Sequence, residues 1–324
     1  TSNQKLKILY LWKILNENTD EEHGLTISEI SEKLFDYEIN SERKSIYDDI
    51  ETLKNFGVDI CCSHSKAYEY FIAQRSFELP ELKLLADAVA SSKFITEKKS
   101  LQLISKLETL TSKHDAKKIR RQVYIANRIK TLNEQIYYNV DKIHFAIAED
   151  KQVSFKYFEY TLDKQKKFRN DGKAYIASPY ALTWDDENYY MIAFYEKYNN
   201  LSNLRVDKME DISIINDKRH ENGKNFDLAS YSKKNFSMFR GDELNVGFEA
   251  DNSLVGVFFD RFGKDIIIFP KTASTFETHV EVAVSPSFLG WVFQFGDKIK
   301  ILSPESVVNQ INEQLEKIKK NYKN

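Results

Sequence analysis

Residues 41–57 read SERKSIYDDIETLKNFG, and this stretch decides the fold of the N-terminal part of the chain. Its apolar residues recur at helical spacing and are expected to face a core: Ile46, Ile50, Leu53 and Phe56. We expect Ser41 to be the N-cap of this helix, because its hydroxyl can accept a hydrogen bond from the first turn. Gly57 is expected to end the helix, since glycine adopts the left-handed backbone that closes many helices.

Two further helices are expected before this stretch, and a hairpin after it. Thr26 and Glu29 have the spacing of a capping box for the second helix, whose expected buried residues are Ile27, Ile30 and Leu34. The first helix is expected to be amphipathic, lined by Leu6, Leu9, Tyr10, Trp12 and Ile14. Strand-like runs at 58–62 and 67–72 flank a polar tip. Three helices followed by such a hairpin predict a winged helix-turn-helix over residues 1–75.

The exposed side of the third helix suits DNA. Arginine binds guanine through two hydrogen bonds, and Lys, Ser and Tyr side chains suit phosphate. The residues predicted to contact DNA are Thr26, Ser41, Arg43, Lys44, Ser45, Tyr47 and, at the hairpin tip, Lys66. The alternative is a helix whose polar face is only solvated. Asp48, Asp49 and Glu51 would repel phosphate, so they must face away from DNA or orient the basic residues.

Residues 76–141 are rich in Leu, Lys and Ala and are expected to form a helical connector. Between Lys98 and Lys130, ten basic residues stand against two acidic ones. A solvated helix face is favoured over direct DNA contact for this block. The whole chain of 324 residues has 47 Lys and Arg against 49 Asp and Glu, so no overall basic field indicates nucleic acid.

The remaining sequence predicts two β-rich domains. Short alternating strands with polar turns over residues 142–225 predict a small barrel. Over residues 226–324 the order β-α-β-β-α-β predicts a ferredoxin-like α/β domain with an added C-terminal helix. That helix has an apolar stripe, for which intramolecular core is favoured over an interface: Val307, Val308, Ile311, Leu315 and Ile318. The expected fold class is therefore multidomain α+β.

No set of residues in the sequence predicts an enzyme. Motifs for a nucleophilic serine, a phosphate loop or a zinc helix are missing from it, and its six histidines are isolated. Asp185, Asp186 and Glu187 fall at an expected hairpin tip, where solvated carboxylates are usual. We therefore expect no catalysis, no cofactor and no metal. Two adjacent cysteines, Cys61 and Cys62, fit a reducing compartment, and apolar runs are too short for a membrane span. We expect a cytoplasmic protein.

Three regions resemble the WYL-domain transcriptional regulators. The third helix matches at residues 39–50, followed by Leu53 and Gly57. The barrel matches at 178–182 (SPYAL), 188–193 (NYYMIA) and 204–209 (LRVDKM), and the C-terminal domain at 259–263 (FDRFG), 290–292 (GWV), 295–297 (FGD) and 303–304 (SP). The Trp-Tyr-Leu that names the family is here Tyr189-Tyr190-Met191, so only the Tyr is kept.

The resemblance implies a bacterial transcription regulator with an Sm- or SH3-like barrel that senses a nucleic acid or nucleotide. Arginine suits phosphate, and tyrosine rings suit bases. The residues of this chain suited to such an effector are Tyr157, Ser178, Tyr180, Tyr190 and Arg205. The alternatives are that the tyrosines, Tyr157 above all, are barrel core, and that Arg205 pairs with Asp207 or a neighbouring carboxylate.

Two half-sites on operator DNA favour a homodimer, and we expect it to use the connector and the C-terminal domain together. The other function left open is an RNA- or single-stranded-DNA-binding accessory module of a nuclease or defence system. In that module the barrel and the basic connector would hold the nucleic acid, while the winged helix would contact proteins.

Overall fold

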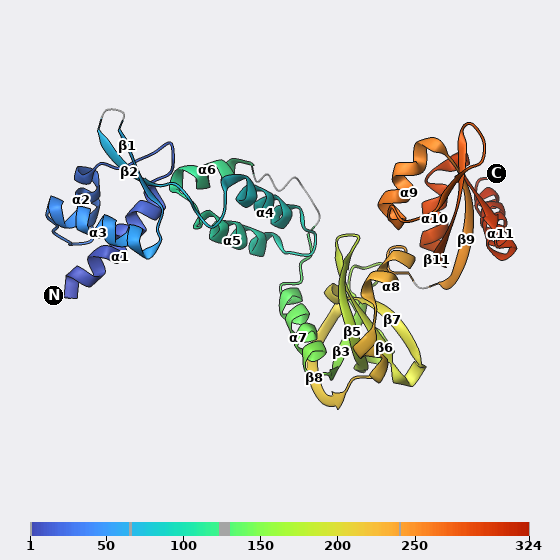
Figure 1. Cartoon of the computed structure of the whole chain (residues 1–324). Coiled ribbons are helices and arrows are strands. Elements are labelled where there is room, and N and C mark those ends of the chain that lie inside the picture. The colour runs from blue at the N-terminus through green and yellow to red at the C-terminus, as the bar shows by residue number, and fades with distance from the viewer. Residues whose placement is uncertain (1, 65–66, 123–129, 240, 324) are drawn as a thin grey trace. The chain divides into compact units, whose positions relative to one another are not determined.

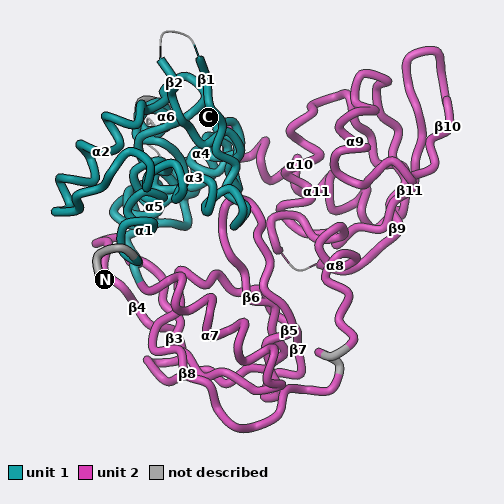
Figure 2. The backbone as a smooth tube through the Cα atoms, turned by 60° about the vertical axis from the view of Figure 1, so that its left-hand side comes forward, with its two compact units in different colours: residues 1–134 teal, residues 135–324 magenta. Residues whose placement is uncertain are grey.

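The computed structural model describes residues 2–64, 67–122, 130–239 and 241–323. The chain forms two compact units, Thr1–Glu134 and Gln135–Asn324, coloured separately in Figure 2. Both are labelled by element in Figure 1. The fold class is mixed α+β, with several helices and curled antiparallel sheets. No helix in the described part of the chain has the length and apolar character needed to cross a membrane.

The N-terminal part of unit 1 packs three helices and a hairpin around one core. The helices are α1 (Ser2–Asn18), α2 (Ile27–Phe35) and α3 (Arg43–Phe56), and the antiparallel hairpin is β1 (Ile60–His64) with β2 (Tyr68–Ile72). The predicted capping box is confirmed, since Thr26 and Glu29 bond each other's backbone N–H. Gly57 ends α3 with φ 108°, a left-handed conformation that glycine adopts without strain.

The buried face of α1 differs from the predicted one. Leu6, Leu9 and Trp12 are exposed, whereas the helix buries Lys7 with these apolar residues: Leu11, Ile14 and Leu15. Lys7 is 4% exposed because its ammonium lies 2.7 Å from the Asp49 carboxylate of α3. Of the predicted stripe, Ile14 is buried and Tyr10 packs against the core, whereas Leu6, Leu9 and Trp12 face solvent.

Two expectations for α3 are also wrong. Its N-cap is Glu42, whose side chain makes no capping bond, and the Ser41 hydroxyl is buried without a partner among the described residues. Phe56 is 85% exposed, because the core-facing positions end at Leu53, one turn earlier. Ile46, Ile50 and Leu53 are buried as predicted.

The rest of unit 1 is a helical connector, with α4 (Leu79–Ser91), α5 (Glu97–Glu108) and α6 (Lys113–Gln122). These helices share a small core of their own: Leu82, Ala86, Ala90, Ile104 and Ile119. Pro80 lies in the first turn of α4, where its missing N–H costs no helical bond. The end of the predicted helical stretch, at residues 123–129, lies outside the described residues.

The first part of unit 2 is a curled antiparallel half-barrel. Its strands are β3 (Lys151–Tyr160), β4 (Lys166–Phe168), β5 (Tyr175–Asp185), β6 (Asn188–Tyr195), β7 (Asn200–Arg205) and β8 (Met209–Lys218). They pair in the order β4-β3-β5-β6-β7, with β8 on the other side of β3. Helix α7 (Ile136–Ala148) packs on β3, β5 and β8, and Asn139 donates to the Met209 carbonyl at 3.2 Å. The predicted domain boundary at 141/142 therefore falls inside a helix that lies wholly on the barrel.

The second part of unit 2 follows the predicted succession β-α-β-β-α-β. After α8 (Leu228–Lys234) come β9 (Asp242–Asp251), α9 (Val255–Phe262), β10 (Ile268–Pro270), β11 (Thr275–Val284), α10 (Pro286–Phe293), β12 (Ile299–Ser303) and α11 (Glu305–Asn321). The sheet order is β10-β11-β9-β12, antiparallel throughout. The core contains a cluster of aromatic rings, among them Phe248, Phe258 and Phe288. Only the first half of the α11 stripe packs on this core, since Leu315 and Ile318 are exposed.

Candidate nucleic-acid interface and barrel pocket

A groove in unit 1 runs between the start of α2, the start of α3 and the hairpin. Three of the predicted DNA-contacting residues line it: Thr26, Arg43 and Tyr47. The exposed Tyr68 of β2 lines the groove too. In the sequence, only the position of Tyr68 in the predicted hairpin indicated a contact with DNA. The Tyr47 ring meets the Tyr70 ring edge-on at 6.2 Å. Burial, with Cys62 as neighbour, raises the pKa of Tyr70 to about 12.

The other predicted DNA contacts lie elsewhere or are already engaged. Lys44 is exposed but does not line the groove, whereas Ser41 lines a separate hollow with Phe35. The Ser45 hydroxyl accepts a hydrogen bond from the Lys7 ammonium. The Thr26 hydroxyl donates to Glu29 at 2.8 Å in the capping box. Lys66 lies outside the described residues.

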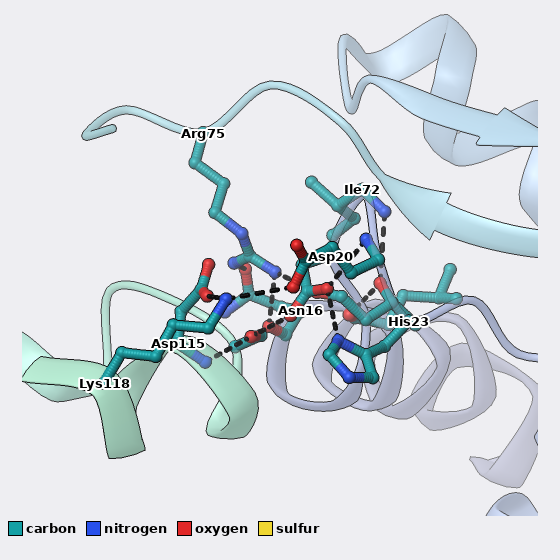
Figure 3. Close-up of polar contacts among 11 residues, drawn as sticks. Asn16, Asp20, His23, Ile72, Arg75, Asp115 and Lys118 are labelled. Atoms are coloured by element: carbon teal, nitrogen blue, oxygen red, sulfur yellow. Dashed lines mark hydrogen bonds and ion pairs between the residues drawn. The ribbon is translucent and has the colours of Figure 1, made fainter. Parts of the chain in front are cut away.

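A buried polar joint ties this part of unit 1 to the connector (Figure 3). Asp20 accepts hydrogen bonds from Ser112 of the connector and from the Glu22 backbone, and its carboxylate lies 2.7 Å from the His23 ring. The guanidinium of Arg75 donates to the Asn16 side chain and to two backbone carbonyls of the α1 end, at 2.7–2.8 Å. This network joins the loop after α1, the irregular segment that follows β2 and the start of α6.

Several described basic residues of the connector are paired within unit 1. Arg120 holds the buried carboxylate of Glu108, and Lys118 lies 2.8 Å from Asp115 and 3.0 Å from Glu22. Lys130 donates to the Ser92 carbonyl at 2.7 Å, next to the end of α4. Such pairing neutralises the charge that phosphate would need, which agrees with the structural interpretation of the basic block.

The predicted effector residues of the half-barrel lie on two different faces. Directly opposed residues of antiparallel strands share a face, and alternate residues of one strand do too. Tyr190 opposes Arg205, and Ser178 opposes Phe194, so all of them share one face of β5, β6 and β7. We call it the α8 face, because Asn203 on it accepts a hydrogen bond from Tyr231 of α8 at 2.8 Å.

Ser178 and Tyr180 take part in closing the barrel at this face. The Ser178 hydroxyl accepts from the His220 backbone N–H at 2.9 Å, and the Tyr180 hydroxyl lies 2.9 Å from Nδ1 of His220. Gly223 packs on the Tyr180 ring so closely that a Cβ there would lie 2.7 Å from a ring carbon. Tyr180 is buried, and burial raises its pKa. These two side chains hold the segment that follows β8.

Arg205 is paired with Asp207, which was the alternative to effector binding predicted from the sequence. The two side chains make two hydrogen bonds, of 3.0 and 2.8 Å. Burial raises the pKa of Tyr190. The positive charge of Arg205 acts in the opposite direction but does not outweigh burial. Tyr157 is buried and is hydrogen-bonded to the backbone of Arg205.

A pocket of about 130 Å³ opens on the opposite face of β6 and β7, which we call the pocket face. It is lined by Tyr157, Arg169, Tyr175, Tyr195, Tyr198, Asn200, Ser202 and Leu204. Tyr195 and Asn200 oppose each other across the β6–β7 ladder. The Tyr195 hydroxyl and Asn200 Oδ1 are both buried, and neither has a hydrogen-bond partner among the described residues. An unpaired buried polar group lowers the stability of the fold by about 1–3 kcal/mol. The presence of two such groups distinguishes this pocket.

Burial keeps two of the tyrosines in the pocket, Tyr157 and Tyr195, neutral. Burial raises the pKa of Tyr157 to about 12, and it raises the pKa of Tyr195 as well. The Arg169 guanidinium lies 5.3 Å from the centre of the Tyr157 ring and pairs with Glu159 in a half-exposed position. The pocket can therefore offer neutral hydroxyl donors, an amide and one cation. Of its lining, sequence analysis had indicated only Tyr157.

The acidic turn between β5 and β6 is less solvated than predicted. Asp185 is partly buried, and burial raises the pKa of its carboxyl group despite the charge of Arg261. Its Oδ2 has no hydrogen-bond partner in the described part of the chain. Within those same residues, no three His, Cys, Asp or Glu side chains are grouped as metal ligands would be.

Comparison with known proteins gives two domain matches. Residues 138–214 match the WYL domain, and residues 260–319 match the WCX domain. The first match covers most of the half-barrel and α7, and the second covers the C-terminal part from α9 to α11. The two matches support a WYL-type regulator or accessory protein.

Among solved structures, the chain is similar to proteasome accessory factor B/C (PafBC) of Arthrobacter aurescens, with 17% sequence identity and a TM-score of 0.32. The similarity covers 100% of this chain and 49% of that chain, so this chain spans about half the length of PafBC. No curated protein matches the sequence.

Proposed function

We propose that the chain is a homodimeric, DNA-binding transcription regulator without enzymatic activity. In this proposal the N-terminal part of unit 1 is a winged helix-turn-helix, and the WYL half-barrel responds to an effector. One observation carries the DNA-binding proposal: Arg43 and Tyr47, one turn apart at the start of α3, line the same groove as Thr26 and the hairpin residue Tyr68.

The proposed contacts follow from the position of these side chains. The first turns of a recognition helix enter the major groove, where an arginine fork suits O6 and N7 of guanine. Arg43 is exposed at that end of α3, so we assign it to a base. Lys44 and Tyr47 are assigned to phosphate, since an ammonium group and a hydroxyl both bind its oxygens.

The competing function, an RNA-binding accessory module, depends on a free basic connector. The described connector cations Arg120 and Lys118 pair with carboxylates of unit 1, and Lys130 binds backbone carbonyls. A phosphate backbone would have to compete with these partners, and the Lys118–Glu22 pair is also a contact between the connector and the loop after α1. This favours the regulator.

The effector role of unit 2 is supported by the WYL match and by the polar and aromatic side chains on both faces of the half-barrel. On the α8 face, Arg205 and Tyr190 lie together, but a phosphate at Arg205 would compete with Asp207. Any effect of an effector on DNA binding is a coupling free energy, typically 1–3 kcal/mol, or about 5–150-fold in affinity.

A gel shift separates the two functions. The full chain is titrated into duplex fragments from the promoter region of its own gene, and into single-stranded RNA of the same sequence. The regulator proposal predicts that one duplex fragment binds at least tenfold more tightly than scrambled duplex, with RNA no better than the scrambled DNA. Tight RNA binding together with no preference among duplexes would reject it in favour of the accessory module.

A further inference from the structure

We propose that a pocket between α8 and β11 binds a small organic acid, which is a carboxylate group on an apolar body. The pocket has a volume of about 310 Å³ and lies at one edge of the C-terminal sheet. Its lining comes from α8, from the end of α9 with the loop after it, and from β11. The inference goes beyond the proposed regulator and does not depend on it, because the pocket is separate from the α3 groove and from the half-barrel pocket.

The edge of β11 is open beside this pocket. β10 pairs with β11 only as far as Ile268 opposite Thr278, and past that point none of the described strands pairs with this edge. Alternate residues of an antiparallel strand direct their main-chain groups to the same side. The Thr275 carbonyl accepts from the Lys271 N–H on the β10 side, so the main-chain groups of Glu281 face the open edge. Such an edge offers hydrogen bonds to a molecule that fills the gap.

One part of the lining is apolar. It consists of Phe262 at the end of α9, Ile266 in the following loop and Val280 of β11. The aromatic core holds Phe262, whose ring centre lies 5.6 Å from that of Trp291. The volume is about ten times the ~30 Å³ that one water occupies in the liquid. The pocket therefore has room for a body of roughly ten non-hydrogen atoms, such as a phenyl ring on a short alkyl chain.

The other part of the lining carries hydrogen-bond donors. Ser230 and Lys233 lie one turn apart on α8, so they share a face of that helix. His279 of β11 lines the pocket with them. The side chains of these three residues make no hydrogen bond or ion pair with other described residues. A carboxylate only accepts hydrogen bonds, and it accepts them most strongly from a charged donor such as an ammonium group.

The charges of the lining favour an occupant with a single negative charge. Lys234 is already engaged, since its ammonium lies 2.8 Å from Glu243 and 3.0 Å from Glu281. Lys233 is thus the cation of the lining that remains to neutralise a ligand. A phosphate ester carries about −1.5 to −2, and the second charge would be repelled by Glu281, which also lines the pocket. A carboxylate meets no such excess.

The test is isothermal titration of the full chain, without DNA, with two acids, 3-phenylpropionate and octanoate. The comparison ligands are 3-phenylpropionamide, 2-phenylethyl phosphate and acetate. We expect at least one of the two acids to bind with a Kd of about 1 mM or below. The neutral amide should bind at least about tenfold more weakly than its acid, because it loses the charge-assisted hydrogen bond. Acetate has no apolar body to bury and should not bind detectably.

Three variants place the ligand in this pocket. Lys233→Gln should weaken the acids about tenfold and leave the amide unchanged. Ile266→Ala should weaken acid and amide alike, since both bury the same apolar body against that side chain. Lys264→Gln, at an exposed position outside the lining, is the matched control for Lys233→Gln and should bind like the wild type. Lys233→Gln should also keep the wild-type melting temperature, because Lys233 has no partner among the described residues.

Four results would each overturn the proposal. They are the absence of binding by both acids at millimolar concentration, equal affinity for the acid and its amide, tighter binding of the phosphate ester than of either acid, and wild-type affinity in Lys233→Gln. Promoter binding is measured separately and without acid, so loss of this proposal would leave the regulator proposal intact. Acid binding by a chain that binds no promoter would uphold the pocket and reject the regulator.

Discussion

The guanidinium of Arg205 is held by the carboxylate of Asp207, with Nε 3.0 Å from Oδ1 and Nη2 2.8 Å from Oδ2. This hydrogen bonding raises the pKa of Arg205 above its already high ordinary value, so the pair stays charged. The fork expected to bind phosphate is thus occupied by a neighbour in the same turn. Since both side chains are partly exposed, the pair is of the kind that contributes little to stability.

A double-mutant cycle tests this pairing. Arg205→Ala and Asp207→Ala should each lower the free energy of unfolding by about 0.5–1 kcal/mol. The double variant should lose no more than either single one, because each change already removes the same interaction. Denaturant unfolding of the full chain gives the three values. Strictly additive losses would show that the two side chains act independently.

The Lys7–Asp49 pair should matter more, since it fixes α3 against α1. The Lys7 side chain is 5% exposed and the Asp49 side chain 20%. Asp49→Ala leaves a buried positive charge without its carboxylate and should lower the stability of unit 1 by about 3–5 kcal/mol. The neighbouring Asp48→Ala, at an exposed position, is the control and should change it by less than about 0.5 kcal/mol. Equal losses in the two variants, measured by circular dichroism in urea, would contradict the role given to the pair.

The joint at Asp20 predicts acid sensitivity. Burial alone would raise the pKa of Asp20, but hydrogen bonds that its carboxylate accepts from Ser112, His23 and the Glu22 backbone N–H outweigh burial and lower the pKa below 3.8. A carboxyl group whose pKa is lowered by folding stabilises above its unfolded pKa, and that stability is lost as the pH falls toward the folded pKa. Asp20→Asn should therefore be less stable than the wild type at pH 7 by about 1–3 kcal/mol.

The difference between Asp20→Asn and the wild type should shrink as the pH falls from about 4 to about 2. Asp87→Asn, at an exposed position of α4, should keep the wild-type pH profile. The measurement is urea unfolding across that pH range. A gap between wild type and Asp20→Asn that stays constant with pH would mean that the Asp20 charge does not stabilise the joint.

Dimerisation is expected to use the exposed end of α11 together with the connector. Leu315 and Ile318 are 45% and 38% exposed, although they continue the stripe that packs on the C-terminal core. Light scattering of the full chain should give twice 38.0 kDa. Leu315→Glu combined with Ile318→Glu should move the mass toward 38.0 kDa, whereas Leu162→Glu, in the exposed turn after β3, should not. A wild-type mass of 38.0 kDa at micromolar concentration, unchanged by DNA, would contradict the dimer.

The elements that sequence analysis predicted correctly have local causes. Thr26 and Glu29 make a capping box within four residues, and Gly57 ends α3 through its own backbone freedom. The face of α1 was wrong because it depends on a long-range partner. Apolar spacing favoured Leu9 as buried, but the helix instead buries Leu11 and Leu15 in the core and pairs Lys7 with Asp49 of α3.

The barrel site shows the same limit of local patterns. Tyr157 and Arg205 are recognisable as residues that suit a nucleotide, yet strand alternation and register place Arg205 on the α8 face and the pocket on the other. Tyr195 and Asn200 cannot be singled out from the sequence. Whether their polar atoms find hydrogen-bond partners depends on how β6 and β7 pair and on the surrounding strands. Lys66, also among the predicted contacts, stays a prediction.

The most direct measurement of the central proposal is fluorescence anisotropy of a promoter duplex with Arg43→Ala and Lys44→Ala, across a range of salt concentrations. Arg43→Ala should cost about 1–3 kcal/mol, or about 5–150-fold in affinity, and relax the preference at one base pair. Lys44→Ala should weaken all duplexes alike and reduce the slope of log affinity against log salt by about one. Lys13→Ala, at an exposed position of α1, should bind like the wild type. If Arg43→Ala and Lys44→Ala also bind the duplex like the wild type at every salt concentration, α3 is not the DNA-reading helix.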